Sequence, residues 1–229
     1  MKLGIEIHEG DLGIRNIKSN HLTMKNKNKE KVTEYESELE SSFDLVLKEA
    51  EELYQGQGRL KKTCDRLAKC LDDLGVSYSL VGGYALILHG VRRFTEDIDL
   101  LVTNEGLTKL HKELIGRGYV LVTPESRNLR DVETGVQIEF LVTGEFPGDG
   151  KPKPVAFPDP QVVEETREGI KVINLKSLIE LKLASGMTAK ARLQDLADVQ
   201  RLIEQHRLSS DFAEHLHPYV REKFLELLP

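Results

Sequence analysis

The sequence predicts an α/β (α+β) protein with a mixed β-sheet core and additional helices at its N-terminal and C-terminal ends. Between residues 76 and 174, short strand-like segments alternate with segments of helical periodicity, which is the pattern of such a core. Helical patterns dominate residues 34–75 and 175–229. A chain of 229 residues is long enough to bury this core without a disulfide or structural metal.

The composition excludes several classes of protein. Charged residues make up 31% of the chain, and no apolar run approaches the ~20 residues that a membrane-spanning helix requires. The N-terminal residues lack the apolar core of a secretion signal, so we expect a soluble, cytoplasmic protein with no membrane partner. A net charge of −6 argues against non-specific coating of nucleic acid, although a local basic patch could still bind RNA.

The only two cysteines, Cys64 and Cys70, are six residues apart in a helical pattern. Their side chains therefore point in well-separated directions and cannot easily form a disulfide. We interpret them as reduced packing residues.

Residues 1–33 lack sustained periodicity and end in a basic, Asn-containing stretch, MKNKNKEK. This composition offers little apolar surface to bury, so we predict a mobile tail. Met24 begins the basic stretch, and a start site at this methionine is an open alternative.

Two helices are expected before the first strand. The first runs from Tyr35 to about Gln55, and the second from about Leu60 to Leu74, with Gly75 as a left-handed C-cap. Each has an apolar stripe at helical spacing. The stripe residues are Leu39, Phe43, Val46, Leu47 and Ala50 in the first helix, and Leu60, Cys64, Leu67, Leu71 and Leu74 in the second.

The predicted core begins with a strand, a helix and a second strand. A further helix, a strand and a hairpin that turns at Thr134–Gly135 follow, so the sheet is expected to be mixed. The segments are, in order, VSYSLVG, GYALILHG, DIDLLVT, residues 105–117, YVLVT, LRDVET and VQIEFLV.

The stretch EFPGDGKPKPVAFPDP contains too much Pro and Gly for regular structure, so we predict a long ordered loop or a lid. A short strand, GIKVINL, follows, and Asn174 is expected to cap the helix after it. Another helix ends near His206. Ser209 or Ser210 is expected to cap a last helical segment, which Pro218 interrupts or restarts.

Asp97 and Asp99 are two residues apart in an apolar strand, so both carboxylates lie on one face. Two carboxylates on one face repel each other unless a cation lies between them. Because the neighbouring residues are apolar, surface solvation explains the pair poorly. The alternative is an exposed sheet edge or a cap at the start of the strand.

Gly82 and Gly83 lie where a strand meets a helix, and there backbone N–H groups can face a phosphate without an intervening side chain. Alone, this pair would indicate only a tight turn. Together with the acidic strand about fourteen residues later, it predicts phosphate donors and metal-binding carboxylates at the same end of one sheet. That combination serves phosphoryl or nucleotidyl transfer.

The segment VGGYALILHGVRRFTEDIDLLV resembles the signature of the DNA polymerase β-like nucleotidyltransferase superfamily, hG[GS]…DhD. It is most similar to the bacterial AbiEii-like and minimal nucleotidyltransferase group, which shows RxTxDID. The resemblance spans about residues 76–205. It implies a mixed-sheet nucleotidyltransferase core that binds Mg²⁺, one ion or two, for which Mn²⁺ can substitute. It also implies a nucleoside triphosphate, such as ATP, as substrate.

The resemblance further assigns residues to this site. It implies that Asp97 and Asp99 bind the metal together with a third carboxylate, Glu139, at a position where the family usually has Asp. An exposed strand residue is the alternative for Glu139. If VQIEFL is an inner strand beside DIDLLV, alternation places Gln137, Glu139 and Leu141 on one face and Ile138, Phe140 and Val142 on the other. Gly83 stands where the family often has Ser, so only backbone contacts to phosphate are expected there. The residues implied in nucleotide binding are Gly82, Gly83, Arg93, Thr95 and Lys182.

Other polar residues have two interpretations each. Lys182 could instead be a solvated helix lysine. Arg192 could complete the site with Asp195 and Asp198, as related toxins do, but surface ion pairing is the favoured interpretation. Lys151 and Lys153 could approach an acceptor or lie in a solvated loop, and His89 is expected to be structural.

The resemblance implies transfer of a nucleoside monophosphate to an RNA 3′ end, a protein hydroxyl or a small molecule, with Glu139 activating the acceptor. Such an enzyme could act as the toxin of a toxin–antitoxin pair, in which case it would have a partner protein. The main alternative is a catalytically decayed, nucleotide-binding or partner-binding protein that resembles an antitoxin. A purely structural α/β protein would leave the acidic pair unexplained.

Overall fold

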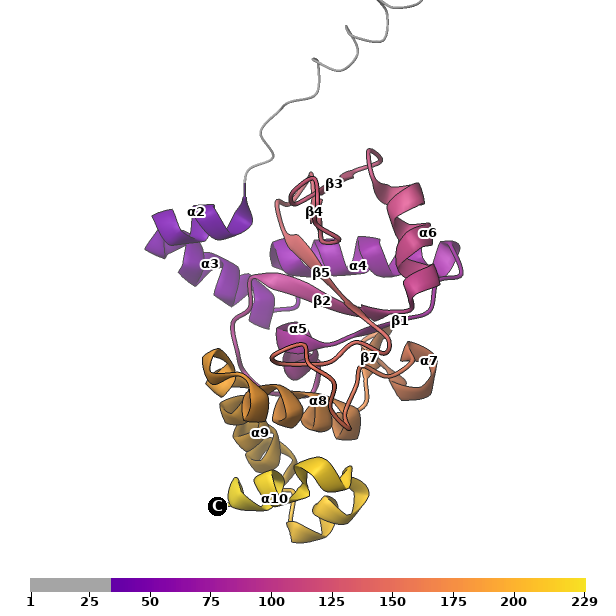
Figure 1. The fold of residues 1–229 in the computed structure, drawn as a ribbon. Coiled ribbons are helices and arrows are strands. Elements are labelled where there is room, and N and C mark those ends of the chain that lie inside the picture. Colours follow the sequence, from indigo (N-terminus) through magenta and orange to yellow (C-terminus); the bar gives the residue numbers. More distant parts are fainter. Residues whose placement is uncertain (1–33) are drawn as a thin grey trace, which may run out of the picture. The chain divides into compact units, whose positions relative to one another are not determined.

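The structure is a computed structural model that describes residues 34–229, so the predicted tail at residues 1–33 and the alternative start at Met24 lie outside the described part. Within that part, a mixed sheet has helices on both faces (Figure 1). No helix among the described residues is both long and apolar enough to cross a membrane.

Residues 34–75 contain three helices, α2 (Tyr35–Ser41), α3 (Phe43–Tyr54) and α4 (Gly58–Asp73). The prediction of one continuous first helix is therefore wrong. Ser42 interrupts it with an extended backbone, and its side chain accepts a hydrogen bond from the Leu45 N–H as the N-cap of α3. Its apolar stripe is also partly wrong, because Phe43 and Leu47 are exposed.

Helix α4 agrees better with the sequence pattern. Its predicted stripe is buried from Leu60 to Leu71, and Gly75 follows with a left-handed φ of +62°. Cys64 is buried in this helix, and both Cys64 and Cys70 are free, as predicted.

The strands between residues 34 and 229 form a seven-stranded sheet in the order β3-β4-β5-β2-β1-β7-β6. The pairs β2–β5 and β1–β7 are parallel and the others are antiparallel, so the predicted mixed sheet is confirmed. The strands are β1 (Tyr78–Leu80), β2 (Asp97–Val102), β3 (Tyr119–Leu121), β4 (Leu129–Asp131), β5 (Gln137–Val142), β6 (Glu164–Arg167) and β7 (Ile170–Ile173).

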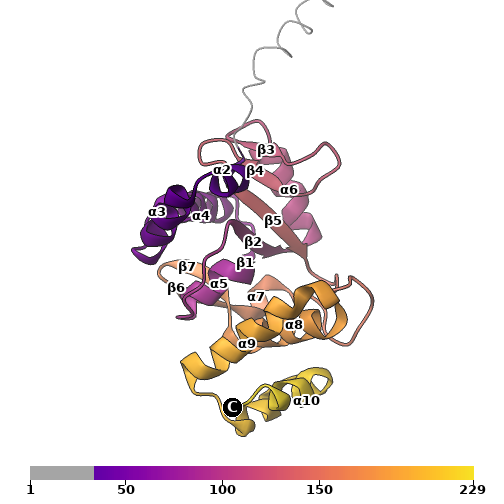
Figure 2. The same ribbon diagram turned by 90° about the vertical axis from the view of Figure 1, so that its left-hand side faces the viewer.

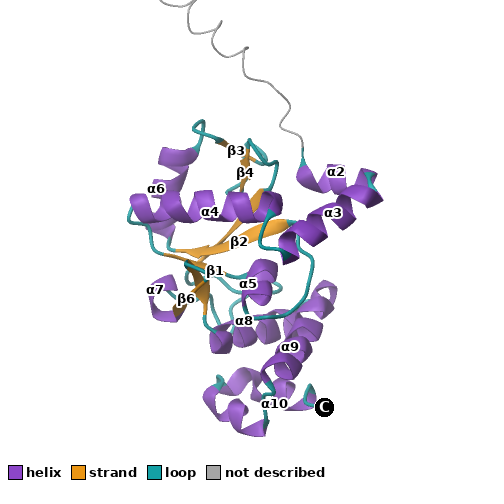
Figure 3. Cartoon of the chain, turned by 180° about the vertical axis from the view of Figure 1, so that it is seen from behind, coloured by secondary structure: helices purple, strands orange, loops and turns teal. Residues whose placement is uncertain are grey.

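Helices α4 and α6 (Asn104–Leu114) cover one face of the sheet, and α5 (Gly82–Leu88) and α8 (Leu175–Thr188) lie on the other (Figures 1 and 3). Alternation along β2 places Ile98 and Leu100 in the core, whereas Asp97 and Asp99 face α5 and are only half-buried. The burial of Ile98 and Leu100 on one face of β2 thus keeps the two carboxylates on the other face.

The C-terminal region begins with α8, whose N-cap Asn174 accepts a hydrogen bond from the Ser177 N–H at 2.9 Å, as predicted. A 3₁₀ turn, η1 (Lys190–Arg192), leads into α9 (Leu193–His206), and η2 (Ser210–His215) leads into α10 (Pro218–Glu226), which packs on α8 (Figure 2). Pro218 therefore restarts a helix. Ser209 takes the N-cap position of η2, as predicted, but its side chain makes no cap hydrogen bond.

The Pro- and Gly-rich stretch after β5 is irregular, as predicted. Hydrogen bonds of 2.8 Å between Gly144 and Phe157 and between Phe157 and Glu145 close its base. The short helix α7 (Pro160–Val163) and strand β6 follow it, and neither was predicted. The loop lies beside α8 on the face that carries the acidic residues (Figure 1).

Candidate active site

Three carboxylates meet on the face of the sheet that α5 and α8 cover. Strand β5 runs parallel to β2, with Asp99 paired to Glu139 and Asp97 paired to Gln137. One oxygen from each of Asp97, Asp99 and Glu139 lies within 4.8 Å of the others. The alternation predicted for VQIEFL is confirmed, because Ile138, Phe140 and Val142 are buried on the opposite face. Glu139 is therefore not an exposed strand residue.

The carboxylates raise one another's proton affinity. Burial, followed by the charges of Asp97 and Glu139, raises the pKa of Asp99 to about 7, although Lys182 and the Gly83 backbone N–H counteract part of the rise. Burial and the charge of Asp97 likewise raise the pKa of Glu139. A divalent cation would reverse this penalty by favouring the charged forms. Carboxylate oxygens are the ligands that Mg²⁺ prefers, so the residues present fit such an ion.

The two glycines at the start of α5 let the acidic strand approach closely. Gly82 has a φ of +61°, and a Cβ there would lie 1.6 Å from Asp99 Oδ2. A Cβ on Gly83 would lie 2.4 Å from Thr95 Oγ1, and this hydroxyl donates to Asp97 Oδ1 at 2.8 Å. The pair thus accommodates the carboxylates and Thr95. Contact of its backbone with a phosphate stays a prediction.

Helices α8 and α9 supply a network of charges opposite the acidic residues. Lys182 Nζ lies 2.9 Å from Asp195 Oδ1 and 2.8 Å from Asp198 Oδ2, and Arg93 also donates to Asp198, at 3.0 Å. Lys182 is only 6% exposed, so the solvated-lysine alternative is wrong. The lysine is held between two carboxylates.

Arg192 donates to Asp195 Oδ2 at 2.9 Å, and Ser185 donates to the same oxygen at 2.6 Å. Burial raises the pKa of Asp195, but Lys182, Ser185 and Arg192 outweigh it and lower this pKa below its usual value. A surface ion pair is the interpretation that the sequence favours for Arg192. The Arg192 side chain is indeed 60% exposed, but its partner Asp195 is buried, so the pair is not a surface pair.

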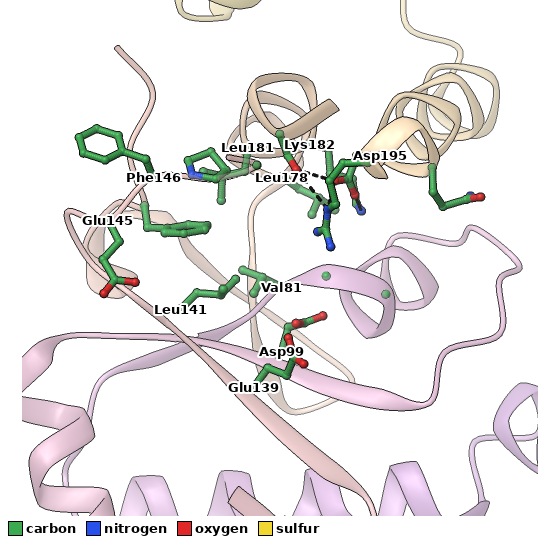
Figure 4. A pocket seen from close by; sticks show the side chains of 18 of the residues that line it. Val81, Asp99, Glu139, Leu141, Glu145, Phe146, Leu178, Leu181, Lys182 and Asp195 are labelled. Atoms are coloured by element: carbon green, nitrogen blue, oxygen red, sulfur yellow. Dashed lines mark hydrogen bonds and ion pairs between the residues drawn. The ribbon is translucent and has the colours of Figure 1, made fainter. Parts of the chain in front are cut away.

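A pocket of about 750 Å³ lies between these two groups (Figure 4). Its lining includes every residue that the resemblance assigned to metal or nucleotide binding. These are Gly82, Gly83, Arg93, Thr95, Asp97, Asp99, Glu139 and Lys182. Apolar side chains also line the pocket, namely Leu141, Phe146, Phe157, Leu178 and Leu181.

Some residues that line the pocket were not identified from the sequence, and two lysines that were considered from the sequence do not line it. Arg127, Glu145, Ser185 and Gln194 also line it, and nothing in the local sequence distinguishes them. Lys153 is bonded within its own loop, where its ammonium group donates to Asp149 Oδ1 at 2.6 Å and to the Pro147 carbonyl oxygen. Neither Lys151 nor Lys153 is among the described residues that line the pocket, so their predicted approach to an acceptor finds no support there.

His89 lies outside this pocket, in the core. Its Nε2 is 2.8 Å from the Ile173 carbonyl oxygen, and its side chain is buried. Burial lowers the pKa of His89. This geometry agrees with the structural role expected from the sequence.

No model of a known protein family matches the chain, and no curated protein matches it. Among solved structures, the chain is similar to an antigenic nucleotidyltransferase-like protein from Paracoccidioides brasiliensis, with 21% identity and a TM-score of 0.43 over 64% of this chain and 76% of that one. It is also similar to JHP933 from Helicobacter pylori (19% identity, TM-score 0.41, 72% and 75% covered). A third is ANT(2″)-Ia, solved in complex with adenylyl-2″-tobramycin (13%, 0.46, 68% and 91%). Likeness at these values assigns no activity.

Proposed function

We propose that this protein is a Mg²⁺-dependent nucleotidyltransferase that moves a nucleoside monophosphate from a nucleoside triphosphate to an acceptor hydroxyl. The convergence of Asp97, Asp99 and Glu139 within 4.8 Å in a pocket with cationic side chains on its other wall carries the proposal. The sequence resemblance to DNA polymerase β-like nucleotidyltransferases supports it.

In the proposed reaction, the acceptor oxygen forms a bond to the α-phosphorus, and the bond from that phosphorus to the bridging oxygen of pyrophosphate breaks. Asp97 and Asp99 would hold Mg²⁺, whose charge stabilises the anionic phosphates when bound. Glu139 would take the acceptor proton as a general base, or would hold a second ion whose charge polarises the hydroxyl. One or two ions, and substitution by Mn²⁺, are part of this proposal.

The cationic wall would hold the triphosphate. Arg93 donates to Asp198 through Nη1, and Arg192 donates to Asp195 through Nε. A guanidinium group has five N–H donors, so further N–H groups of both arginines remain for phosphate oxygens. Lys182 contributes its charge, but its position depends on both carboxylates. Backbone N–H groups at Gly82 and Gly83 are further proposed phosphate contacts.

The acceptor is an RNA 3′ end, a protein hydroxyl or a small molecule, and a toxin-like role with a partner protein follows from the resemblance to the AbiEii-like group. The cytoplasmic location stays a prediction from the sequence.

A second candidate is a nucleotide-binding or partner-binding, antitoxin-like protein that has lost catalysis. One observation favours it, because Lys182 is already engaged by Asp195 and Asp198 instead of being free for a phosphate. This protein would bind a triphosphate without releasing pyrophosphate.

The test incubates the purified protein with each α-³²P-labelled nucleoside triphosphate, Mg²⁺ and total RNA. We expect label on RNA, on the protein or on a small product, together with released pyrophosphate. Asp97→Ala should abolish transfer, whereas Asp65→Ala, an exposed carboxylate on α4, should not. Binding of a triphosphate without any labelled product, whichever nucleoside triphosphate is supplied, would favour the second candidate.

A further inference from the structure

The Glu139 carboxylate is attached to a hydrogen-bonded chain behind the pocket. Gln137 Nε2 donates to Glu139 Oε1 at 2.8 Å. The two residues are separated by one position on β5, so their side chains lie on the same face. Glu139 lines the pocket and Gln137 is not among the residues described as lining it. Gln137 therefore contacts the carboxylate without itself lining the pocket.

The amide of Gln137 has only one orientation that satisfies its neighbours. Arg130 on β4 is paired with Gln137 in the antiparallel register, and Arg130 Nη2 lies 3.3 Å from Gln137 Oε1. A guanidinium group only donates hydrogen bonds, so the amide oxygen must face Arg130. The amide NH₂ group then faces Glu139 and acts as a donor.

Arg130 is itself firmly placed. Its side chain is buried, and its Nη1 donates to the Gly135 carbonyl oxygen and, at 2.7 Å, to Glu36 Oε2 on α2. The Arg130 ion pair thus joins the hairpin turn between β4 and β5 to the N-terminal helix. The chain Glu36–Arg130–Gln137–Glu139 runs from α2 to the acidic cluster.

We propose that Gln137, oriented by Arg130, is a positioning residue that holds one oxygen of Glu139 and so aims the carboxylate at the site shared with Asp97 and Asp99. The inference rests on the proposed function of that site. A purely structural alternative is that Gln137 only satisfies the buried Arg130. The two differ in whether loss of the amide changes metal binding and turnover or only folding stability.

The experiment uses Gln137→Met, which keeps the length of the side chain and removes both of its hydrogen bonds. Mn²⁺ is titrated calorimetrically into wild-type protein and variant. Loss of groups that orient a metal ligand weakens metal binding or activity 10- to 100-fold, so we expect the Mn²⁺ Kd to rise about tenfold. In the transfer reaction, kcat should fall by a similar factor while KM for the triphosphate stays within about twofold.

Two further variants make the result specific. Gln161→Met is the matched control, because Gln161 donates to Ser77 Oγ at 2.6 Å and lies outside the pocket, so Mn²⁺ affinity and kcat should stay at the wild-type level. Gln137→Asn keeps an amide that is too short to span Arg130 and Glu139, and its effect should have the same direction as that of Gln137→Met. If Gln137→Met does not fold, Mn²⁺ affinity and kcat are measured on Gln137→Asn instead.

The outcomes separate the two claims. A Gln137→Met or Gln137→Asn protein with a changed melting temperature but wild-type Mn²⁺ affinity and kcat would overturn the positioning role and leave the proposed function intact. Wild-type protein that binds no Mn²⁺ would overturn the proposed metal site, and the positioning role with it.

Discussion

Asp99 and Glu139 face each other as register partners on the parallel strands β2 and β5. Both strands bury their other faces, through Ile98 and Leu100 on β2 and Ile138 and Phe140 on β5. A shift of either strand by one residue would turn its carboxylate into the core and its apolar residues into the pocket. The hydrophobic core therefore fixes the geometry of the acidic cluster.

Replacing Asp99 with Asn should stabilise the metal-free protein, and the gain should grow with pH. The pKa of Asp99 is raised to about 7 in the folded state, above its unfolded value of about 3.9, so the native protein binds more protons in this window. Wild-type stability from this group thus falls as pH rises from about 4 to 7, whereas Asn does not titrate.

Melting curves in EDTA at pH 5 and pH 8 measure this effect, with a gain on the order of 2–4 kcal/mol expected at pH 8. Asp97→Asn and Asp99→Asn should both fold and both lose transfer. A stability difference for Asp99→Asn that does not change with pH would contradict the proposed charge repulsion, and full activity in either variant would place the site elsewhere.

Glu139 can be tested by changing its length and its charge separately. Glu139→Asp keeps the charge but withdraws the carboxylate by one methylene, so nucleotide binding should persist while transfer slows. Glu139→Gln removes the charge and the proton acceptor, so transfer should be lost. Calorimetry and the transfer assay report the two properties independently. Wild-type turnover by Glu139→Gln would rule out a catalytic role for this carboxylate.

Gly82→Ala should be more damaging than Gly75→Ala, although both glycines have a φ near +60°. At Gly75 an added Cβ meets open space, so only backbone strain of about 1–2 kcal/mol is expected. At Gly82 the Cβ would overlap Asp99. The alanine there should also weaken Mn²⁺ binding, measured beside Gly75→Ala. Equal losses of stability and unchanged Mn²⁺ affinity would show that the close approach of Gly82 to Asp99 is unimportant.

Lys182→Met should destabilise the fold by about 3–5 kcal/mol, because it leaves Asp195 and Asp198 buried without their shared cation. The triple variant Lys182→Met, Asp195→Asn, Asp198→Asn should recover much of the loss. Lys61→Met, which removes an exposed pair with Asp65, should cost less than about 1 kcal/mol in the same denaturant titration. Similar costs for the two single variants would contradict the buried network.

The sequence predicted the features that depend on short-range periodicity. Alternation along DIDLLV and VQIEFL placed Asp97, Asp99 and Glu139 on one face, and the mixed sheet followed from the order of the segments. The break at Ser42 escaped prediction because a single side-chain cap competes with an otherwise continuous helical pattern.

The remaining errors concern contacts between segments that are distant in sequence. Arg93 meets Asp198 across 105 positions, and no local pattern links them. The burial of Lys182 depends on how α9 packs on α8, which decides that its charge is paired and not solvated. Gln137 was assigned to the correct face, but its link to Arg130 required the register of β4 against β5.

Calorimetric titration of each nucleoside triphosphate in Mg²⁺ and again in EDTA tests the central claim most directly. If Asp97, Asp99 and Glu139 hold the ion against the phosphates, at least one triphosphate binds in Mg²⁺ and none binds in EDTA. Asp97→Asn should abolish that binding, while Asp65→Asn on the surface of α4 should retain it. Equal affinity with and without Mg²⁺, or undiminished binding by Asp97→Asn, would contradict the proposed metal-dependent site.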